Sequence, residues 1–472
     1  MPDTTAEYQA TIGLEIHAEL KTRTKMFCDS LNDPSERHPN VNVCPVCLGH
    51  PGTLPVPNEE AVRHVIRVGF ALGGRANEMT KFDRKNYFYP DIPKGYQISQ
   101  YDKPLIEGGM LLGVRVRRVH LEEDTATLAH ADGASLVDYN RAGVPLMELV
   151  TEPDFRSADE VTAFARELQL ILRYLGVSDA NMEMGQMRIE ANVSLNMGTK
   201  VELKNINSFR AVHDATEHEL ARQEEALRRG EKIAQETRGW DEVKRRTVVQ
   251  RSKEEAHDYR YFPEPDIPPF SAANFDLEAL RAEVPELPAA RRERFVREYG
   301  LDAAMAEALA AEPAMADYFE AAVSEFRTRL PEAPLLTLYH YLTTDLRGLM
   351  NQAGTAFDAL KVNPEHLAHL AALIEEKKVT SRQAKDVLLR MFEGGDDPED
   401  IVRDEGIGVT SDTDEVEAVV LAVIAEHHAA VVDYRKGKTA SLQFLIGKAM
   451  GKLKGRARPE MLREIFERNL TA

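Results

Sequence analysis

The chain has 472 residues, of which 43% are hydrophobic, and a formal net charge of −19. This length exceeds a single hydrophobic core, so we expect two or three domains. No apolar run reaches the roughly 18 residues of a membrane helix, the first residues are not a signal peptide, and three cysteines argue against a disulfide scaffold. We therefore expect a cytoplasmic protein without a membrane partner, and the acidic charge argues against indiscriminate nucleic-acid binding.

A strictly alternating segment, TIGLEIHAEL, occupies residues 11–20. Successive side chains of a strand point to opposite faces, so the alternation predicts a strand with one apolar face. Its polar face carries Glu15, His17 and Glu19. Residues 186–195 repeat the pattern and set Arg188 and Glu190 opposite apolar side chains. Faces built around carboxylates and imidazole are typical of a site for a hard divalent cation.

The three cysteines lie close together in the sequence, at Cys28, Cys44 and Cys47. The last two form a CxxC pattern that is typical of part of a zinc knuckle. A closed structural zinc site needs four ligands, so His38, His50, Asp29 or water would have to complete it. A thiol cluster without metal explains the same spacing.

Residues 81–102, KFDRKNYFYPDIPKGYQISQYD, combine cationic, aromatic and amide side chains with Pro90, Pro93 and Gly95. The prolines and glycine predict an ordered loop here, not a strand or a helix. Cations and rings suit a polyanionic substrate, with cations for phosphate and rings for a base or ribose. A packed irregular loop with a solvated edge is the alternative.

Acidic residues gather again at residues 120–124, HLEED. In a strand, Glu123 would share a face with Leu121, and Glu122 with Asp124, so at most half of them can converge on one site. Further polar residues follow at Asp138, Asn140, Arg141, Glu148, Glu152, Asp154, Glu202, Lys204 and Asn205. Acidic runs are often solvated surfaces, but their position in strands that also bury apolar faces favours a site.

Two helices are expected in this first part of the chain. Residues 157–160, SADE, form a capping box, and apolar residues recur at helical spacing until Gly176. Residues 208–229 predict a charged helix that Gly230 ends. Strands, turns and helices together indicate an α+β domain in the first ~265 residues, and the prolines at 263–269 then interrupt regular structure.

From about Pro288 the sequence is rich in Ala, Glu, Leu and Arg, which predicts an all-α domain. Residues 405–415, EGIGVTSDTDE, indicate a polar hinge before a final module of two or three helices. We expect domains at 1–290, 291–405 and 410–472. Gly437-Lys438-Thr439 is not a phosphate loop, because Val432 stands where that motif requires glycine.

The final module contains a basic run with one acid, Asp433. Its cations are Arg435, Lys436, Lys438, Lys448, Lys452, Lys454, Arg456 and Arg458. Neutralising phosphates releases counterions, so RNA backbone binding is a natural use for such a run. A solvated basic helix end is the alternative.

Taken in order, these segments resemble the B subunit of bacterial aspartyl/glutamyl-tRNA amidotransferase. The resemblance rests on IGLEIHAELKT, CPVCLGHPGTLPVPN, KFDRKNYFYPDIPKGYQISQYD, HLEEDTA, DYNRAGVPLMELVTEPD, VELKNINSF, QETRGWD, DYRYFPEPD and VVDYRKGKTASLQFLIGKAMGKLKGRARP. These motifs are long and specific, and they span essentially the whole chain.

The resemblance implies a cradle domain with a mixed or antiparallel sheet of the glutamine synthetase and guanidino kinase type, then a helical domain and a small helical tail. It implies a glutamine-hydrolysing, ATP-dependent carbon–nitrogen ligase of protein biosynthesis. ATP with Mg²⁺ would phosphorylate the side-chain carboxylate of Asp-tRNA(Asn) or Glu-tRNA(Gln), and ammonia would then displace phosphate. The A subunit would release that ammonia from glutamine, within a heterotrimer with the C subunit.

The resemblance also implies roles for single residues. Glu15, His17, Glu123 and Glu190 would hold Mg²⁺. Arg84 and Lys85 would neutralise phosphates, with Arg141, Arg188 and Lys204 as further phosphate or nucleotide contacts. The basic run from Arg435 to Arg458 would bind the body of the tRNA.

One departure concerns the cysteines, because relatives carry Phe-Cys-x-Cys where this chain has Phe27-Cys28-Asp29-Ser30. Ser30 thus replaces an expected zinc ligand. Two other functions remain open: a tRNA-binding scaffold without ATP or Mg²⁺ dependence, and a metal-dependent hydrolase of phosphate esters that needs neither glutamine nor partners.

Overall fold

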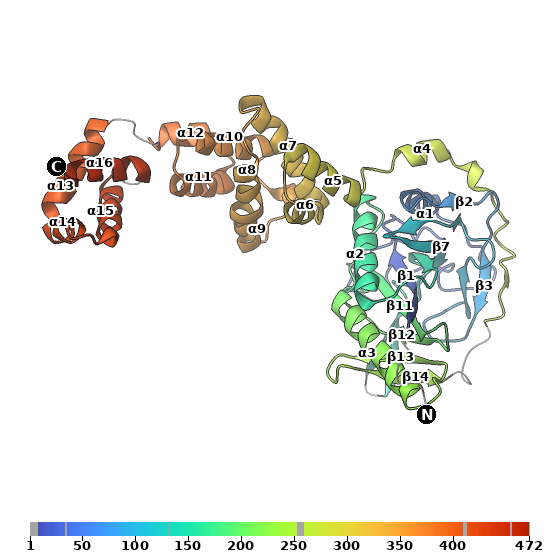
Figure 1. Ribbon diagram of the computed structural model, residues 1–472. Helices are drawn as coiled ribbons and strands as arrows, with labels where there is room; N and C mark the ends of the chain where they lie inside the picture. The colour runs from blue at the N-terminus through green and yellow to red at the C-terminus, as the bar shows by residue number, and fades with distance from the viewer. Residues whose placement is uncertain are drawn as a thin grey trace. The chain divides into compact units, whose positions relative to one another are not determined.

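The computed structural model describes residues 8–33, 35–131, 133–252, 259–408, 413–453 and 456–471. Contacts between residues divide the chain into two compact units, Met1–Pro288 and Ala289–Ala472 (Figure 1). None of the helices in these ranges is both long enough and apolar enough to span a bilayer.

The first unit is built on a ten-stranded mixed sheet (Figure 1). In spatial order its strands are β14 (Arg246–Ser252), β13 (Glu236–Asp241), β12 (Val201–Lys204), β11 (Met187–Leu195), β1 (Ala10–Glu19), β10 (Pro145–Thr151), β7 (Val114–Glu123), β5 (Ile106–Glu107) and β2 (Arg75–Ala76), with β6 (Met110–Leu111) also paired to β7. Strands β12 and β13 pair parallel, and the other described pairs of this sheet are antiparallel. The two predicted alternating strands are confirmed as β1 and β11.

Helices cover the apolar side of this sheet, with α2 (Ala158–Tyr174) and α3 (Phe209–Arg228) packed against each other (Figure 1). Helix α1 (Glu59–Ala71), the short η2 (Ala272–Asn274) and α4 (Leu277–Ala282) contribute side chains to the same core. Ile12 and Ile16 of β1 and Phe164 and Leu168 of α2 are fully buried in that core. The alternation of β1 therefore stabilises the fold by removing apolar surface from water.

The predicted start of α2 is confirmed, but its capping box is only half formed. The Ser157 hydroxyl accepts a hydrogen bond from the Glu160 N–H at 3.2 Å. The Glu160 carboxylate accepts from the N–H of Arg156 at 2.7 Å, one residue before the expected donor. Gly176 follows the helix with a φ of +66°, a left-handed conformation that glycine adopts without strain.

The prediction of a loop throughout residues 81–102 is wrong in part. Strand β3 (Asp83–Asn86) pairs antiparallel with β4 (Tyr96–Ser99) and with β15 (Phe262–Pro263). The partner strand β15 comes from a distant part of the chain, which local proline and glycine signals cannot reveal. A separate hairpin consists of β8 (Thr127–Ala131) and β9 (Ala134–Asp138).

The second unit contains two separate hydrophobic cores. The first gathers apolar side chains from Phe295 to Ile401. Its helices are α5 (Pro288–Tyr299), α6 (Ala303–Ala310), α7 (Pro313–Arg329), α8 (Leu336–His340), η3 (Tyr341–Leu346), α9 (Arg347–Ala353), η4 (Phe357–Ala359), α10 (Pro364–Glu375), α11 (Ser381–Gly394) and α12 (Pro398–Asp404).

The second core lies within the C-terminal tail and runs from Val416 to Leu470. Four helices build it, where two or three were expected: α13 (Thr413–Glu426), α14 (His428–Arg435), α15 (Thr439–Lys452) and α16 (Pro459–Thr471). Of the expected polar hinge, residues 409–412 lie outside the described residues. The coarse prediction of a sheet domain followed by helices is confirmed.

Candidate functional site

The polar side of the ten-stranded sheet, which we call the front face, lies opposite the apolar side chains that α2 and α3 cover. Residues directly opposite each other in paired strands project from the same face. One row along this face contains Lys204, Glu190 and Glu15, and the next contains Arg188, His17, Glu148 and His120. The strand register therefore gathers side chains from segments that are far apart in the sequence.

Three carboxylates form the first cluster, called here the Glu15 cluster. Oxygens of Glu15, Glu190 and Glu202 lie within 4.8 Å of one another. Burial and the charges of neighbouring carboxylates, including Glu190 and Glu202, raise the pKa of Glu15. Carboxylates crowded in this way would be stabilised by a divalent cation, which prefers oxygen ligands.

Two neighbouring side chains already contact the Glu15 cluster. The Asn192 amide donates to Glu15 Oε1 at 3.1 Å. The Lys204 ammonium lies 2.9 Å from Glu190 Oε2 and 3.5 Å from Glu202 Oε1. Burial lowers the pKa of Lys204, but the charges of these two carboxylates outweigh it and the pKa is raised. Lys204 thus remains a cation beside the cluster.

A second group, the His17 cluster, lies beside the first and contains His17, Glu122 and Glu148, with ligand atoms within 4.8 Å of one another. His17 Nε2 lies 3.4 Å from Glu122 Oε1 and 3.5 Å from Glu148 Oε2. Burial lowers the pKa of His17, but the hydrogen bond and charge of Glu148 outweigh it and raise the pKa to about 9. His120 Nε2 also contacts Glu148 Oε2, at 3.3 Å. A metal at His17 would have to displace a proton.

Glu123 lies on the opposite, apolar face of β7, because side chains alternate along a strand and Glu123 follows Glu122 of the front face and shares its own face with the buried Leu121. Glu123 is 4% exposed, and its carboxylate lies 2.7 Å from the Lys94 ammonium. The N–H of Ile98 donates to its other oxygen at 3.0 Å. The structure therefore does not bring Glu123 to Glu15, His17 and Glu190, and it places Glu122 beside His17 instead.

Arg84 and Lys85 lie on β3 and have different surroundings. Arg84 donates to both carboxylate oxygens of Glu264, at 2.7 and 2.8 Å, and lies over the Tyr96 ring at 4.1 Å. The Lys85 ammonium is 5.1 Å from the centre of the Tyr259 ring. Burial lowers the pKa of Lys85, but the charges of Glu122 and other groups outweigh it and raise the pKa. Lys85 is thus the cation of this pair whose charge interacts with carboxylates of the His17 cluster.

Arg141 and Arg188 meet at one buried carboxylate, that of Asp124. Arg141 donates to Asp124 Oδ2 at 2.7 Å and to Glu19 at 3.1 Å, and Arg188 lies 2.5 Å from the same Asp124 oxygen. Burial raises the pKa of Asp124, but the two guanidinium groups outweigh it and hold the pKa well below its usual range. These arginines already form ion pairs in the free chain, whereas Lys204 contacts the Glu15 cluster and the charge of Lys85 interacts with Glu122 and Glu148.

The three thiols converge as the sequence spacing suggested, with sulfur atoms within 4.8 Å of one another. Cys44 and Cys47 sulfurs are 3.9 Å apart, and the Ser30 hydroxyl is 3.9 Å from Cys47 Sγ. The buried ammonium of Lys25 lies 3.8 Å from Cys47 Sγ. Zinc could find three sulfur ligands here, but it would meet a positive charge beside one of them.

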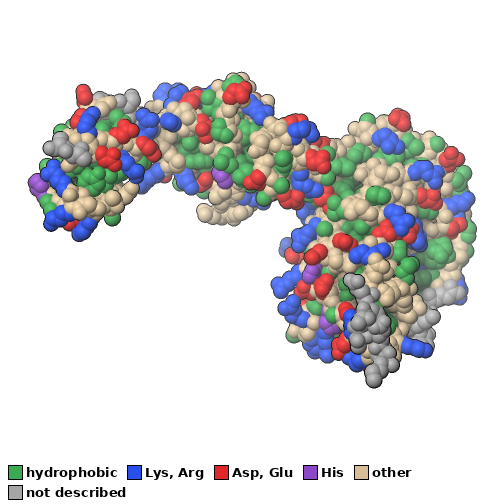
Figure 2. Space-filling model, in the orientation of Figure 1, with side chains coloured by type: hydrophobic (Ala, Val, Ile, Leu, Met, Phe, Trp, Pro, Cys, Tyr) green, Lys and Arg blue, Asp and Glu red, His purple; other side chains and the backbone are tan. Residues whose placement is uncertain are grey.

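In the basic run of the tail, Arg435 ends α14, Lys448 and Lys452 lie on α15, and the other described cations lie in the segments that follow these helices. Figure 2 shows Lys and Arg side chains gathered over this part of the tail. Arg435, Lys436, Lys438, Lys448, Lys452 and Arg458 are exposed and Arg456 is half-buried, whereas Lys454 lies outside the described residues. Lys452 pairs with Glu426 at 2.5 Å and Arg456 with Glu415 at 2.6 Å. No ion pair joins Lys436 or Lys448 to another described residue.

Glu122, Glu148 and Glu202 complete the two clusters, although the sequence had not singled them out as metal ligands. Glu148 had a recognisable signal, because it stands alone among the apolar residues of PLMELVT. A single carboxylate in a buried strand is costly unless it has partners. The sequence alone could not show that Glu122, and not Glu123, lies beside His17, because this depends on the register of β7 in the sheet.

The chain was also compared with known proteins. A family model described as the GatB/GatE catalytic domain matches residues 10–277, and one described as the GatB domain matches residues 317–470. The aspartyl/glutamyl-tRNA(Asn/Gln) amidotransferase B subunit of Thermomicrobium roseum is 48% identical, over 98% of this chain and 99% of the relative. The proteins of the same name from Thermus thermophilus and Carboxydothermus hydrogenoformans are 46% and 44% identical, with at least 97% of each chain covered. With one model matching more than half of its residues and these relatives matching almost end to end, the chain belongs to the family of aspartyl/glutamyl-tRNA(Asn/Gln) amidotransferase B subunits.

Proposed function

We propose that this chain phosphorylates the side-chain carboxylate of Asp-tRNA(Asn), Glu-tRNA(Gln) or both, and completes their amidation. A carboxylate oxygen would attack the γ-phosphorus of ATP and release ADP. Ammonia would then attack the acyl carbon, and inorganic phosphate would leave as the amide forms. Transfer of this kind needs positioning and charge neutralisation more than a covalent nucleophile. The observation that carries the proposal is the pair of carboxylate clusters on the front face.

The Glu15 cluster offers the oxygen ligands that Mg²⁺ prefers, and the His17 cluster offers two carboxylates and an imidazole. When bound, Mg²⁺ would supply neutralisation of the phosphate charge. Lys204 contacts the Glu15 cluster, and the charge of Lys85 interacts with Glu122 and Glu148, so we assign both lysines to the transferred phosphate. Arg141 and Arg188 could bind phosphate only if their ion pairs with Asp124 broke. Arg84 could do so only if its ion pair with Glu264 broke.

The proposal also assigns a role to each part of the chain. We assign the mixed-sheet unit to a cradle of the glutamine synthetase and guanidino kinase type, at 1–290. The two cores of the second unit would be a helical domain at 291–405 and a tRNA-binding tail at 410–472. The A and C subunits would be its partners in a cytoplasmic heterotrimer, with the A subunit supplying ammonia. The name of the relatives, which describes one subunit of an enzyme acting on tRNA(Asn/Gln), supports this assignment.

Zinc at the cysteines is a separate proposal. The three thiols could bind it as thiolates with water or the Ser30 hydroxyl in the fourth position. Lys25 would oppose the metal by its charge and favour a thiolate instead, so we propose at most a weakly held zinc ion. Zinc analysis of the purified chain before and after dialysis against a chelator tests this.

The decisive experiment replaces Glu15 by Gln in the chain reconstituted with the A and C subunits. We expect E15Q to abolish ATP-dependent amidation of both mischarged tRNAs and to leave tRNA affinity unchanged, because the tail is intact. Glu183→Gln is the matched control, since Glu183 is exposed in the turn that precedes β11. Amide formation and ADP release are measured with ATP, Mg²⁺ and glutamine present.

Near-normal turnover of E15Q would remove Glu15 from the reaction. Activity of the wild-type complex without ATP or Mg²⁺ would favour a tRNA-binding scaffold. Cleavage of a phosphodiester by the chain alone would favour a hydrolase.

A further inference from the structure

A hydroxyl group on a neighbouring strand contacts the Glu15 cluster from its outer side. Thr237 of β13 donates through its hydroxyl to Glu202 Oε2 at 2.7 Å. Strands β12 and β13 pair parallel, and Glu202 and Thr237 are directly opposite in their register. The contact therefore follows from the strand pairing itself and not from a flexible surface side chain.

The two oxygens of Glu202 have different partners. Oε2 accepts from Thr237, while Oε1 is 3.5 Å from the Lys204 ammonium, which also binds Glu190. A carboxylate held at one oxygen presents the other in a fixed direction. Without the Thr237 hydroxyl, Glu202 could rotate about its side-chain bonds toward Lys204 and away from Glu15.

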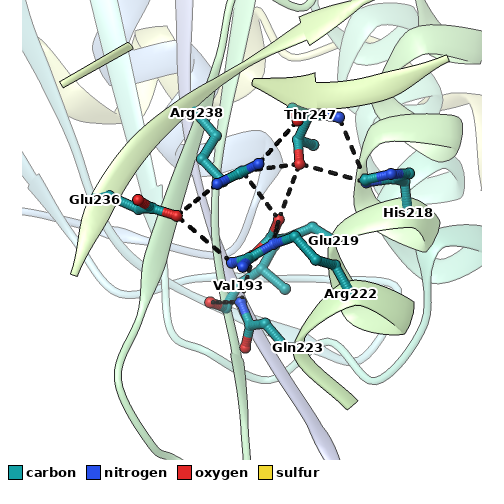
Figure 3. Close-up of polar contacts among 8 residues, drawn as sticks. All are labelled: Val193, His218, Glu219, Arg222, Gln223, Glu236, Arg238 and Thr247. Carbon is teal, nitrogen blue, oxygen red and sulfur yellow. Dashed lines mark hydrogen bonds and ion pairs between the residues drawn. The ribbon is translucent and has the colours of Figure 1, made fainter. Parts of the chain in front are cut away.

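A buried polar network holds β13 in place behind this contact (Figure 3). Arg238, the residue after Thr237, donates to the hydroxyl and the carbonyl of Thr247 in β14, both at 2.9 Å. The Thr247 hydroxyl in turn donates to Glu219 of α3 at 3.2 Å. Glu219 is fully buried and also accepts from Arg222 at 2.7 Å and from Gln223 at 2.8 Å.

This network also reaches the sheet next to the site. Gln223 donates to the carbonyl of Val193 in β11 at 3.2 Å, and Arg238 binds Glu236 at 2.6 Å (Figure 3). Side chains alternate along β13, so Arg238 points to α3 while Thr237 points to the front face. The hairpin of β13 and β14 is thus fastened to α3 on one side and presents Thr237 on the other.

We propose that Thr237 is a positioning residue, which fixes the carboxylate of Glu202 for divalent-cation binding by the Glu15 cluster. The inference rests on the proposed function, because it requires that this cluster binds the ion. Thr237 acts through Glu202 and does not bind the ion itself. Groups that orient metal ligands in this way typically affect metal affinity by about 10–100-fold.

The test measures Mn²⁺ affinity of the full-length chain by electron paramagnetic resonance, without nucleotide or tRNA. Mn²⁺ stands in for Mg²⁺, because carboxylate sites accept both ions. We expect Thr237→Val to weaken Mn²⁺ binding by about tenfold, since valine keeps the shape and loses the hydroxyl. Thr237→Ser should restore binding, because it keeps the donor. Thr328→Val on α7 is the control, since Thr328 is exposed and its hydroxyl donates to the carbonyl of Ser324 in the same helix.

A double-mutant cycle with Glu202→Gln separates positioning from a general effect on the fold. In the E202Q background, T237V should cause no further loss of Mn²⁺ affinity. An equal loss in both backgrounds, or a T237S variant as weak as T237V, would overturn the assignment. Wild-type affinity in T237V with a clear loss in E202Q would also overturn it and leave the metal site standing. Absence of Mn²⁺ binding by the wild-type chain would instead overturn both the site and the inference.

Discussion

Glu148 contacts both histidines of the front face. His17 and His120 each place Nε2 within 3.5 Å of Glu148 Oε2. Both imidazoles and one carboxylate are thus held in a nearly dry environment, where charge interactions are stronger than in water. The pKa of Glu148 is held well below its usual range, because the charges and hydrogen bonds of the histidines outweigh burial.

Replacing Glu148 by Gln should lower the pKa of His17. In the metal-free chain this pKa is about 9, so protonated His17 contributes stability at low pH that is lost as pH rises through about 9. Removing the Glu148 charge should lower the pKa by about one unit or more. NMR titration of selectively labelled histidine with a chelator present measures it.

The control for that titration is Glu152→Gln, which removes a carboxylate bound to Arg117 just after the same strand. Its His17 titration should match that of the wild-type chain. An unchanged pKa in E148Q would show that Glu148 does not maintain the charge of His17.

Single site residues were predictable only where the strand pattern itself revealed them. Glu15, His17 and Glu190 could be placed on one face because each lies in a long alternating strand. The choice between Glu122 and Glu123 depends on which face of β7 meets β1 across β10, and that is a property of the assembled sheet. The ion pairs of Arg84 and Arg188 likewise depend on contacts distant in sequence.

At the scale of whole elements, local signals identified long elements better than short ones. Strands β1 and β11 and helices α2 and α3 carry periodic apolar patterns and caps, so the sequence predicts them well. Strands β3 and β4 have four residues each, and β3 also pairs with β15, whose residues lie about 180 positions away in the chain. Their sequence is dominated by turn residues and could not indicate the pairing.

One ion-pair network joins three helices of the second unit. Arg329 at the end of α7 donates to both oxygens of Glu376, at 2.6 and 2.7 Å, and lies 2.5 Å from Glu399 of α12. Glu376 directly follows α10. Its hydrogen bond from Arg329 lowers the pKa of Glu376 from 4.5 to about 2.

We expect this network to make the helical region sensitive to acid. Because the folded pKa is depressed, the pair contributes stability above pH 4.5 that is lost as pH falls toward about 2. Both side chains are partly exposed, so the contribution is about 1 kcal/mol or less. Glu376→Gln should increase hydrogen exchange of α10 at pH 7 and have little effect near pH 2.

Comparing the two proteins at each pH removes the intrinsic dependence of exchange on pH. Glu365→Gln serves as the control, because Glu365 is exposed on α10 and forms no ion pair with another described residue. An equal effect of E376Q at both pH values would contradict the role of the charged pair.

At the scale of the whole molecule, the function proposed above assigns the chemistry to the sheet unit and tRNA binding to the tail. Lys436 is exposed in the turn after α14 and Lys448 is exposed on α15, whereas Lys452 and Arg456 are paired with Glu426 and Glu415. Unpaired cations can neutralise phosphates without first losing a partner, so they should dominate binding to the RNA backbone.

We therefore expect the double variant K436A/K448A to weaken tRNA binding and to reduce the salt slope by about 1.5. The matched variant K452A/R456A removes the same charge but should reduce the slope less. Binding is measured over a range of salt concentrations with the reconstituted complex. Equal slopes for both variants and the wild-type chain would reject the tail as a phosphate contact.

The central position of β1 has a consequence for how this chain can vary. Its register with β10 and β11 determines both which side chains are buried in the hydrophobic core and which lie on the front face. Deleting one residue within β1 would shift the register of the strand on one side of the deletion, so that its polar side chains there would point inward and its apolar side chains outward. Folding and chemistry would fail in the same step, so insertions and deletions should be confined to the connecting loops.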